Sequence, residues 1–344
     1  MKRILIAILS LAIIGAVYFI AAFGLFGFRE GAVIDKVPVP GPTPIVHGLE
    51  PLRQHWDSEA SPVWPAARIM GELSELAYLP PIEAIRKYEA LGFENCVVLS
   101  HNSMIGYVVN QNDILVVVFR GTNPPELSDW FVNLNSVSTS TPNGPIHRGF
   151  KSAYLSLKPQ LIAAVRACDA KHIWVTGHSL GGALALACVQ DLEEGERMHI
   201  DGIVTFGQPM VAKGDLAKHL DDALIGRYVR FVNRTDVVPR VPLSFSPCGR
   251  LVWFTDNGLK RSPPKRLMYG APGDSEFDAS SDEYAEIEPL SRGELERLKE
   301  RIETQGDQQF GSGEQPVLQA GFSPLGDHSM GVYVSEVTQL IGGK

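Results

Sequence analysis

The stretch Ile173-Trp174-Val175-Thr176-Gly177-His178-Ser179-Leu180-Gly181 decides the fold of this 344-residue chain. Its opening is mostly apolar and rich in β-branched and aromatic residues, as in a β-strand, and the run Ala183-Leu184-Ala185-Leu186-Ala187 that follows consists of strong helix formers. The sequence therefore predicts a strand, a sharp turn and a helix. Gly177 and Gly181 flank Ser179 by two positions on each side, where such a turn leaves no room for a larger side chain.

Ser179 is the predicted nucleophile of a catalytic site. The N–H groups at the start of the new helix point at the turn, where they stabilise the negative charge that develops when a hydroxyl attacks a carbonyl. The alternative is a glycine-rich loop in which Ser179 only caps the helix, because a bare G-x-S-x-G pattern also arises by chance. A serine hydroxyl is a poor nucleophile alone, so the chain must also supply a base and an acid that orients it.

His328 is the predicted general base and Asp236 the predicted acid. In α/β-hydrolases the order is serine, acid, histidine, and His199 and His219 lie too close behind the serine for a strand and the acid to fit between. Asp236 follows Arg227-Tyr228-Val229-Arg230-Phe231-Val232, which alternates as a strand does; its alternative is a solvated turn carboxylate. The other carboxylates fall in a helix pattern, in an acidic loop or directly beside the histidine: Asp191, Asp274, Asp278, Asp282 and Asp327.

Further motifs resemble those of the class 3 lipases, the fungal-type triacylglycerol lipase family. They occur in the family's order and span roughly residues 65 to 340. The resemblance implies an α/β-hydrolase fold with a mostly parallel sheet flanked by helices, and a site at the carboxyl ends of the strands. Besides the serine turn, the matching segments are Phe119-Arg120-Gly121-Thr122, Ile146-His147-Arg148-Gly149-Phe150, Phe206-Gly207-Gln208-Pro209, Asn233-Arg234-Thr235-Asp236-Val237-Val238-Pro239 and Asp327-His328.

The resemblance also implies an oxyanion hole. The backbone N–H groups of Thr122 and Leu180 would supply its two donors. For three other polar residues near the site, structural roles are expected: Arg120 as a guanidinium that braces loops, and His147 and His178 as packed histidines, the ring of His178 pointing away from the serine.

The segment after Thr122 is expected to form a lid. Ser128 or Asp129 caps a short helix that carries Trp130, Phe131 and Leu134 at helical spacing, and Leu127 directly before it is a further predicted lid residue. In the family this position carries a movable flap. The alternative is a fixed helix that packs into the core. If the helix is a lid, turnover should rise once an insoluble ester passes its solubility limit.

The chain divides into a predicted transmembrane anchor at 1–30, a Pro-rich linker at 31–64 and the hydrolase domain at 65–344. Lys2-Arg3 precedes an uncharged, largely apolar run at 4–28, which is long enough to cross a bilayer. The positive start places the catalytic domain on the periplasmic, extracellular or lumenal side. The alternative is a cleaved signal peptide, although no clean cleavage site ends the run.

Within the hydrolase domain, two segments carry further expectations. Residues 66–92 are predicted to be helical. The long interval between the acid and the base predicts an inserted surface subdomain at about 243–322, with an acidic run at 274–288 and a charged helix at 292–303. The sequon Asn233-Arg234-Thr235 lies beside the predicted acid, where a glycan would crowd the site, and is attributed to chance.

Composition excludes several classes of function. The net charge of −8 argues against nucleic acid as a partner. The four cysteines lack the spacing of metal ligands, and no metal motif is visible elsewhere in the sequence, so no metal or other cofactor is expected. The sequence thus predicts a membrane-anchored serine ester hydrolase, a lipase acting on acylglycerols or related lipid esters. Phospholipase A1 and general carboxylesterase are the alternatives within this class. From a different class, the chain could be a non-catalytic membrane-tethered binding domain with a hydrolase fold.

Overall fold

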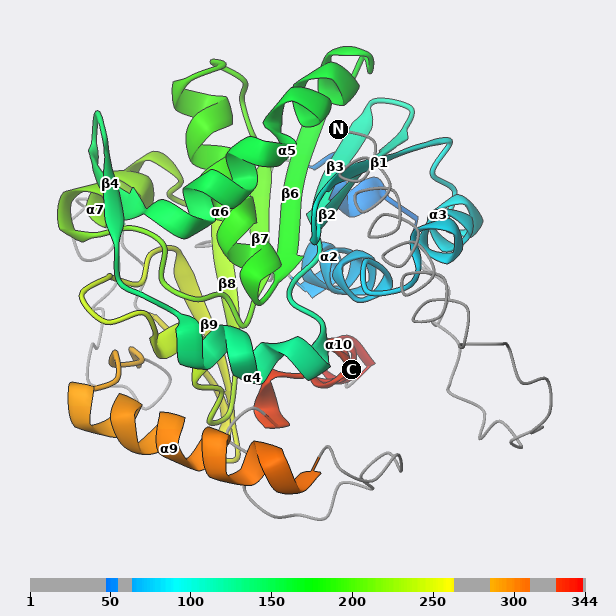
Figure 1. Cartoon of the computed structure of the whole chain (residues 1–344). Coiled ribbons are helices and arrows are strands. Elements are labelled where there is room, and N and C mark those ends of the chain that lie inside the picture. Colours follow the sequence, from blue (N-terminus) through cyan, green and yellow to red (C-terminus); the bar gives the residue numbers. More distant parts are fainter. Residues whose placement is uncertain (1–47, 55–63, 263–284, 310–325, 343–344) are drawn as a thin grey trace, which may run out of the picture. The chain divides into compact units, whose positions relative to one another are not determined.

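The computed structural model describes residues 48–54, 64–262, 285–309 and 326–342, all within the unit Pro44–Lys344 (Figure 1). Three predicted segments lie wholly or mostly outside the described residues: the anchor at 1–30, the linker at 31–64 and the acidic run at 274–288. Within the described ranges, none of the helices combines the length and the hydropathy that a bilayer-spanning segment needs.

The centre of the domain is an eight-stranded sheet with the order β1-β2-β3-β6-β7-β8-β9-β10. The strands from β3 to β9 in this order run parallel, and β1, β2 and β10 are antiparallel to their neighbours. This confirms the predicted mostly parallel sheet. The strands are β1 Asn95–His101, β2 Met104–Gln111, β3 Ile114–Phe119, β6 His172–His178, β7 Gly202–Phe206, β8 Tyr228–Asn233, β9 Arg250–Thr255 and β10 Gly258–Arg261.

Helices cover both faces of the sheet, and each face has its own hydrophobic core. Successive residues of a strand point to opposite faces, so Trp174 and Val175 of β6 are fully buried in different cores. One face carries α5 Arg148–Arg166, α6 Leu180–Glu194 and α7 Gly214–Ala223; the other carries α2 Trp64–Leu76, α3 Pro81–Ala90 and α10 Met330–Gly342.

A third hydrophobic cluster lies outside the two faces. It joins α4 Pro124–Asn133 to α9 Arg292–Gln309, and Figure 1 shows the two helices side by side. Its buried members are Phe131 of α4, Leu298 and Ile302 of α9, and the connecting residues Val237, Val238, Val241 and Leu290. The predicted lid helix is therefore packed against the predicted insertion helix.

Shorter elements complete the described chain. The strands β4 Ser138–Thr141 and β5 Gly144–His147 form a separate hairpin. The 3-10 turns are η1 Glu50–Leu52, η2 Val238–Arg240 and η3 Gly326–His328. The turn η3 carries the predicted base.

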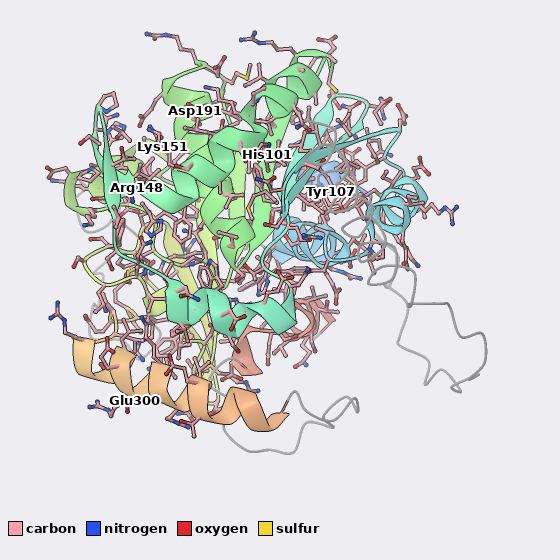
Figure 2. All side chains as sticks on the ribbon, in the orientation of Figure 1. His101, Tyr107, Arg148, Lys151, Asp191 and Glu300 are labelled. Carbon is pink, nitrogen blue, oxygen red and sulfur yellow. The ribbon has the colours of Figure 1, made fainter. Side chains whose placement is uncertain are left out.

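The structure differs from the sequence-based expectations in three places. The helix α4 begins at Pro124, before Ser128 and Asp129, so neither of these residues caps it; proline fits the first turn of a helix, where an N–H group has no acceptor within the helix. The helical run at 66–92 is broken, because Pro80 and Pro81 separate α2 from α3: proline lacks an N–H donor and favours an extended residue before it. The segment 243–322 is not wholly a surface subdomain, because β9 pairs with β8 and continues the central sheet. Its charged helix does form, extends beyond the predicted end to Gln309, and exposes Glu300 (Figure 2).

Candidate active site

Ser179 occupies the sharp turn between β6 and α6. Its backbone has φ 57° and ψ −130°, a strained conformation for a residue with a side chain. Both flanking positions require glycine because the backbone segments around the turn lie too close together for a side chain. A Cβ on Gly177 would lie 2.4 Å from the backbone of Gly181, and a Cβ on Gly181 would lie 2.1 Å from the carbonyl oxygen of Phe119. The predicted strand, turn and helix are thus observed, with the serine at the carboxyl end of a central strand.

Asp236 and His328 are brought together from positions 92 residues apart. Asp236 follows the end of β8, and its Oδ2 accepts a hydrogen bond of 2.8 Å from Nδ1 of His328. Both residues are buried. Because Nδ1 carries the proton of this bond, Nε2 of the neutral ring is left as the basic nitrogen. The other carboxylate oxygen, Oδ1, accepts the backbone N–H of Val238 at 2.9 Å.

Tyr333 is a second side chain that holds Asp236, and sequence reasoning missed it. Its hydroxyl donates to Oδ2 of Asp236 at 2.5 Å and accepts the backbone N–H of Asn233 at 3.0 Å. Burial, with the charge of Asp236 beside it, raises the pKa of Tyr333 well above its ordinary value, so the hydroxyl stays a neutral donor. No motif marks this tyrosine; it lies on α10, five residues after the predicted base.

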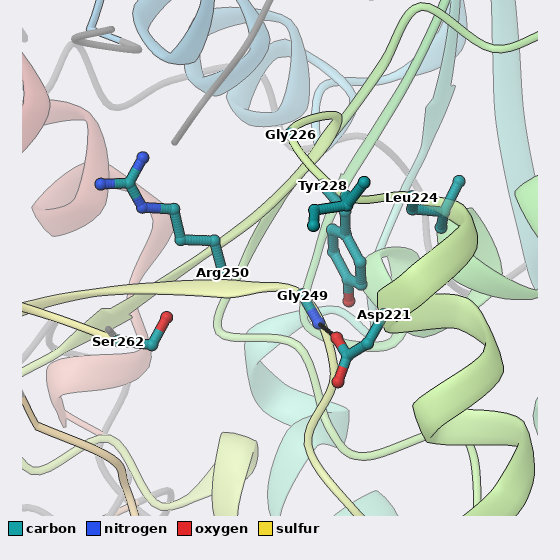
Figure 3. Close-up of a pocket in the computed structure, with 8 residues that line it drawn as sticks. Asp221, Leu224, Gly226, Tyr228, Gly249, Arg250 and Ser262 are labelled. Atoms are coloured by element: carbon teal, nitrogen blue, oxygen red, sulfur yellow. Dashed lines mark hydrogen bonds between the residues drawn. The ribbon is translucent and has the colours of Figure 1, made fainter. Parts of the chain in front are cut away.

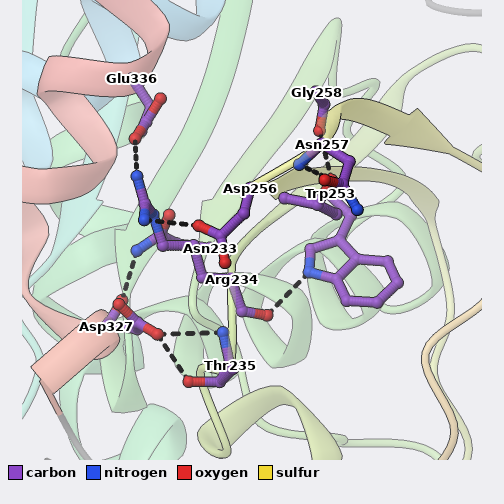
Figure 4. A network of polar contacts seen from close by, with 10 residues as sticks. Asn233, Arg234, Thr235, Trp253, Asp256, Asn257, Gly258, Asp327 and Glu336 are labelled. Carbon is purple, nitrogen blue, oxygen red and sulfur yellow. Dashed lines mark hydrogen bonds and ion pairs between the residues drawn. The ribbon is translucent and has the colours of Figure 1, made fainter. Parts of the chain in front are cut away.

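Asp327 fixes the turn that carries His328. Its Oδ2 accepts hydrogen bonds from Thr235, and its carbonyl oxygen accepts Nδ2 of Asn233 (Figure 4). Asp327 therefore binds the loop of Asp236 and not the imidazole beside it. Asn233 is fully buried, which leaves no room for a glycan on the sequon in this fold.

The predicted nucleophile and the predicted base lie in the same buried region. His178, the residue before Ser179, has its ring centre 4.6 Å from that of His328. Ser179 and His328 are each about 1% exposed. Among the described residues, neither Oγ of Ser179 nor Nε2 of His328 has a protein hydrogen-bond partner. Neither atom is therefore engaged by another described protein group.

The two predicted oxyanion donors lie beside the serine. Leu180 is the first residue of α6, so its N–H has no acceptor within the helix. Thr122 follows Gly121, where an added Cβ would lie 3.1 Å from Cβ of Ser179. The loop after β3 thus packs directly against the nucleophile.

Two cavities meet at this loop. The first, about 300 Å³, is lined by Tyr78, Leu127, His178 and His328 among others, and the second, about 220 Å³, by Arg120, Trp130 and Leu180 among others. Thr122 and Asn123 line both cavities. Each cavity also has a wall from α4, so the predicted lid helix borders the space in which a substrate would bind.

The remaining lid residues are packed in different ways. Phe131 is buried in the cluster with α9, whereas Trp130 stacks on Phe150 with ring centres 6.4 Å apart. Leu134 is partly buried against the same clusters. The helix α4 thus packs against both α9 and α5.

Arg120 and His147 have the structural roles expected from the sequence, and Asp191 lies on a helix as expected. Arg120 donates to the carbonyl oxygen of Ser103 at 3.0 Å. His147 caps α5, where its Nδ1 accepts the N–H of Phe150. Asp191, labelled in Figure 2, lies on α6 and accepts the hydroxyl of Tyr154 at 2.7 Å, away from His328.

A further hollow is too small for a substrate. It holds about 10 Å³, roughly one water molecule, and lies where the N–H of Gly249 donates to Asp221 at 2.6 Å (Figure 3). None of the predicted site residues lines it. Across the described ranges, no group of three or more His, Cys, Asp or Glu side chains is arranged to hold a metal ion.

Part of the chain is similar in sequence to known lipases. Residues 116–246 match the family Lipase (class 3). A lipase of Rhizomucor miehei is 35% identical over 156 residues, which cover 42% of this chain and 42% of that protein. A phospholipase A(1) of Arabidopsis thaliana is 29% identical over 178 residues, which cover 42% of this chain and 39% of that protein.

A solved structure of the triacylglyceride lipase of Rhizomucor miehei matches with a TM-score of 0.48 and 24% identity, over 61% of this chain and 90% of that one. The sequence alignments span less than half the length of both curated relatives. Residues 116–246, which include Ser179 and Asp236, thus match the class 3 lipase family, in agreement with the resemblance inferred from the sequence.

Proposed function

We propose that this protein is a serine ester hydrolase that cleaves acylglycerols or related lipid esters through an acyl-enzyme on Ser179. The observation that carries the proposal is the buried Asp236–His328 pair beside a serine in the strained turn of a nucleophile. Burial makes the carboxylate an effective partner for the imidazolium that forms during the reaction, because few water molecules screen the pair.

Each residue has one role in the reaction. Nε2 of His328 accepts the proton of the Ser179 hydroxyl as Oγ bonds to the ester carbonyl carbon, and the carbonyl oxygen becomes an oxyanion held by the N–H groups of Thr122 and Leu180. The C–O bond to the alcohol then breaks, and His328 gives its proton to the departing oxygen. Water repeats the two steps on the acyl-enzyme and releases the fatty acid.

Lipid esters are the favoured substrates for two reasons. Leu127 and Met330 are apolar members of the lining of the larger cavity, which is suited to acyl chains. The matched relatives include a lipase and a phospholipase A(1), so both classes remain candidates. Products released from emulsified triacylglycerol, from diacylglycerol and from phosphatidylcholine vesicles would separate them.

We also propose that α4 is a lid and that the chain is held at a membrane. Support for the lid is that α4 lines both cavities beside the buried nucleophile. Support for the anchor is the uncharged run at 4–28 after Lys2-Arg3. The size of the membrane-bound product on an immunoblot tests the anchor, because a cleaved signal would shorten the chain.

The decisive experiment is Ser179→Ala, assayed on p-nitrophenyl esters and emulsified glycerides. Essentially all turnover should be lost, and a fluorophosphonate probe should label the wild type but not the variant. Ser156→Ala on α5 is the matched control, because its hydroxyl binds only the carbonyl of Ala153 on its own helix, and it should keep full activity. A folded wild type that neither labels nor hydrolyses any ester would instead support a non-catalytic binding domain.

A further inference from the structure

We propose that Tyr78 and His178 are positioning residues for the base, joined in one directed chain of hydrogen bonds that runs from beside the oxyanion loop to the backbone of His328. The proposal rests on the proposed function, since it assigns how the general base is held. Neither Tyr78 nor His178 belongs to the predicted catalytic triad of Ser179, His328 and Asp236.

The direction of the chain follows from its acceptors. Nε2 of His178 lies 2.7 Å from the carbonyl oxygen of His328, and a carbonyl only accepts, so Nε2 carries the proton. In the neutral ring Nδ1 is then an acceptor, and the hydroxyl of Tyr78, 2.7 Å away, must donate to it. Each side chain therefore has one role, and the tautomer of His178 is fixed.

The ring of His178 is also held by packing. Its centre lies 5.8 Å from that of Tyr78, 4.6 Å from that of His328 and 5.9 Å from that of Tyr333. His178 is only 5% exposed. A buried ring between these partners has few alternative positions, so it transmits the placement of Tyr78 to the turn of His328.

The neutral state of His178 suits this position. Burial lowers the pKa of His178 well below its ordinary value, and the neighbouring His328 lowers it further. His328 becomes a cation when it accepts the serine proton, and a second cation with its ring centre 4.6 Å away would oppose that step. A neutral donor holds the carbonyl of His328 without this cost.

The first member of the chain touches the oxyanion loop. A Cβ added to Gly121 would lie 2.2 Å from the hydroxyl oxygen of Tyr78 and 2.6 Å from the carbonyl oxygen of His178. Thr122 follows this glycine and lines the same cavity as both residues. The loop that holds the oxyanion and the turn that holds the base are thus positioned against the same pair of side chains.

The first test separates positioning from substrate contact, because Tyr78 also lines the cavity. On a soluble p-nitrophenyl ester, Tyr78→Phe should lower kcat about 3- to 10-fold, with KM changed less than twofold. His178→Leu should lower kcat more, and His178→Gln, whose amide nitrogen can still donate to the carbonyl of His328, should recover most of the loss. Tyr154→Phe removes the hydrogen bond of a buried tyrosine that is not among the residues given for the lining of either cavity, and it should leave kcat unchanged.

The second test does not need turnover. In ¹⁵N histidine NMR spectra, His178 should remain the neutral Nε2–H tautomer between pH 5 and 8, also in Ser179→Ala, and Tyr78→Phe should shift its Nδ1 resonance. A wild type that hydrolyses no ester would refute the proposed function but leave this signature intact. An Nδ1–H tautomer, an unchanged kcat in Tyr78→Phe and His178→Leu, or a rise in KM alone would overturn the positioning role.

Discussion

Asp327 Oδ2 accepts two hydrogen bonds from Thr235, one from its backbone N–H at 3.0 Å and one from its hydroxyl at 2.6 Å. The two residues are the immediate neighbours of His328 and Asp236. The base and its acid are therefore joined twice, once through their own side chains and once through the residues beside them. This second connection fixes how far the turn η3 can move from the end of β8.

Asp327→Ala should weaken both catalysis and stability. Two hydrogen bonds to a charged acceptor disappear, so the free energy of unfolding should fall by about 1–2 kcal/mol and kcat by about tenfold. Chemical denaturation and ester hydrolysis measure the two effects. Asp256→Ala is the control, because Asp256 pairs with Arg234 in the same network but is mostly exposed, and it should change little. Equal effects of the two substitutions would contradict the assignment.

Tyr333→Phe should lower kcat about 3- to 10-fold. The substitution removes one of the donors to the carboxylate of Asp236 and also leaves the buried N–H of Asn233 without its acceptor. The free energy of unfolding should fall by about 1–3 kcal/mol for the same reason. If kcat is unchanged in the folded variant, the tyrosine has no part in orienting Asp236.

Gly181→Ala should prevent the active fold from forming. The new Cβ would meet the carbonyl oxygen of Phe119 at 2.1 Å, a backbone atom that cannot move without breaking the contact between β3 and β6. Soluble yield and fluorophosphonate labelling measure the outcome. Gly293→Ala on α9, whose Cβ would meet only the end of the Arg297 side chain at 3.4 Å, should fold and label normally.

The parts of the site that follow from local chemistry could be predicted from the sequence. The composition changes from strand formers to helix formers around Ser179, with glycines two positions away on each side. This pattern is sufficient to predict the strand, the turn and the helix. Asp236 and His328 follow from the order of residue types along the chain and from a strand pattern before the acid. These inferences need the neighbours of each residue and the order of residue types along the chain, but no contact between distant segments.

The parts that depend on distant contacts could not be predicted. Tyr78 is hydrogen-bonded to His178, 100 residues further along the chain, and Tyr333 to Asp236, 97 residues before it. No pattern in the sequence links the members of either pair. The packing of α9 against α4 could not be predicted either. Its charged sequence predicts an exposed helix, but only the fold shows that Leu298 and Ile302 join the cluster of Phe131.

The contact between α4 and α9 offers a test of the proposed lid. Leu298→Ala combined with Ile302→Ala removes apolar contacts from the side of α4 that faces α9, so the closed state should lose stability relative to an open one. The variant should hydrolyse a dissolved short-chain ester faster than the wild type does. Rates below and above the solubility limit of one ester measure this, and the increase at the limit should be smaller in the variant.

Glu300→Ala is the control for this lid experiment, because Glu300 lies on the same helix but is exposed, outside the cluster (Figure 2). It should show the same increase at the solubility limit as the wild type. A wild-type rate that saturates smoothly through the limit would mean that α4 does not open at an interface. In that case the double variant should lose stability without gaining activity on the dissolved ester, since α4 would be a fixed wall of both cavities.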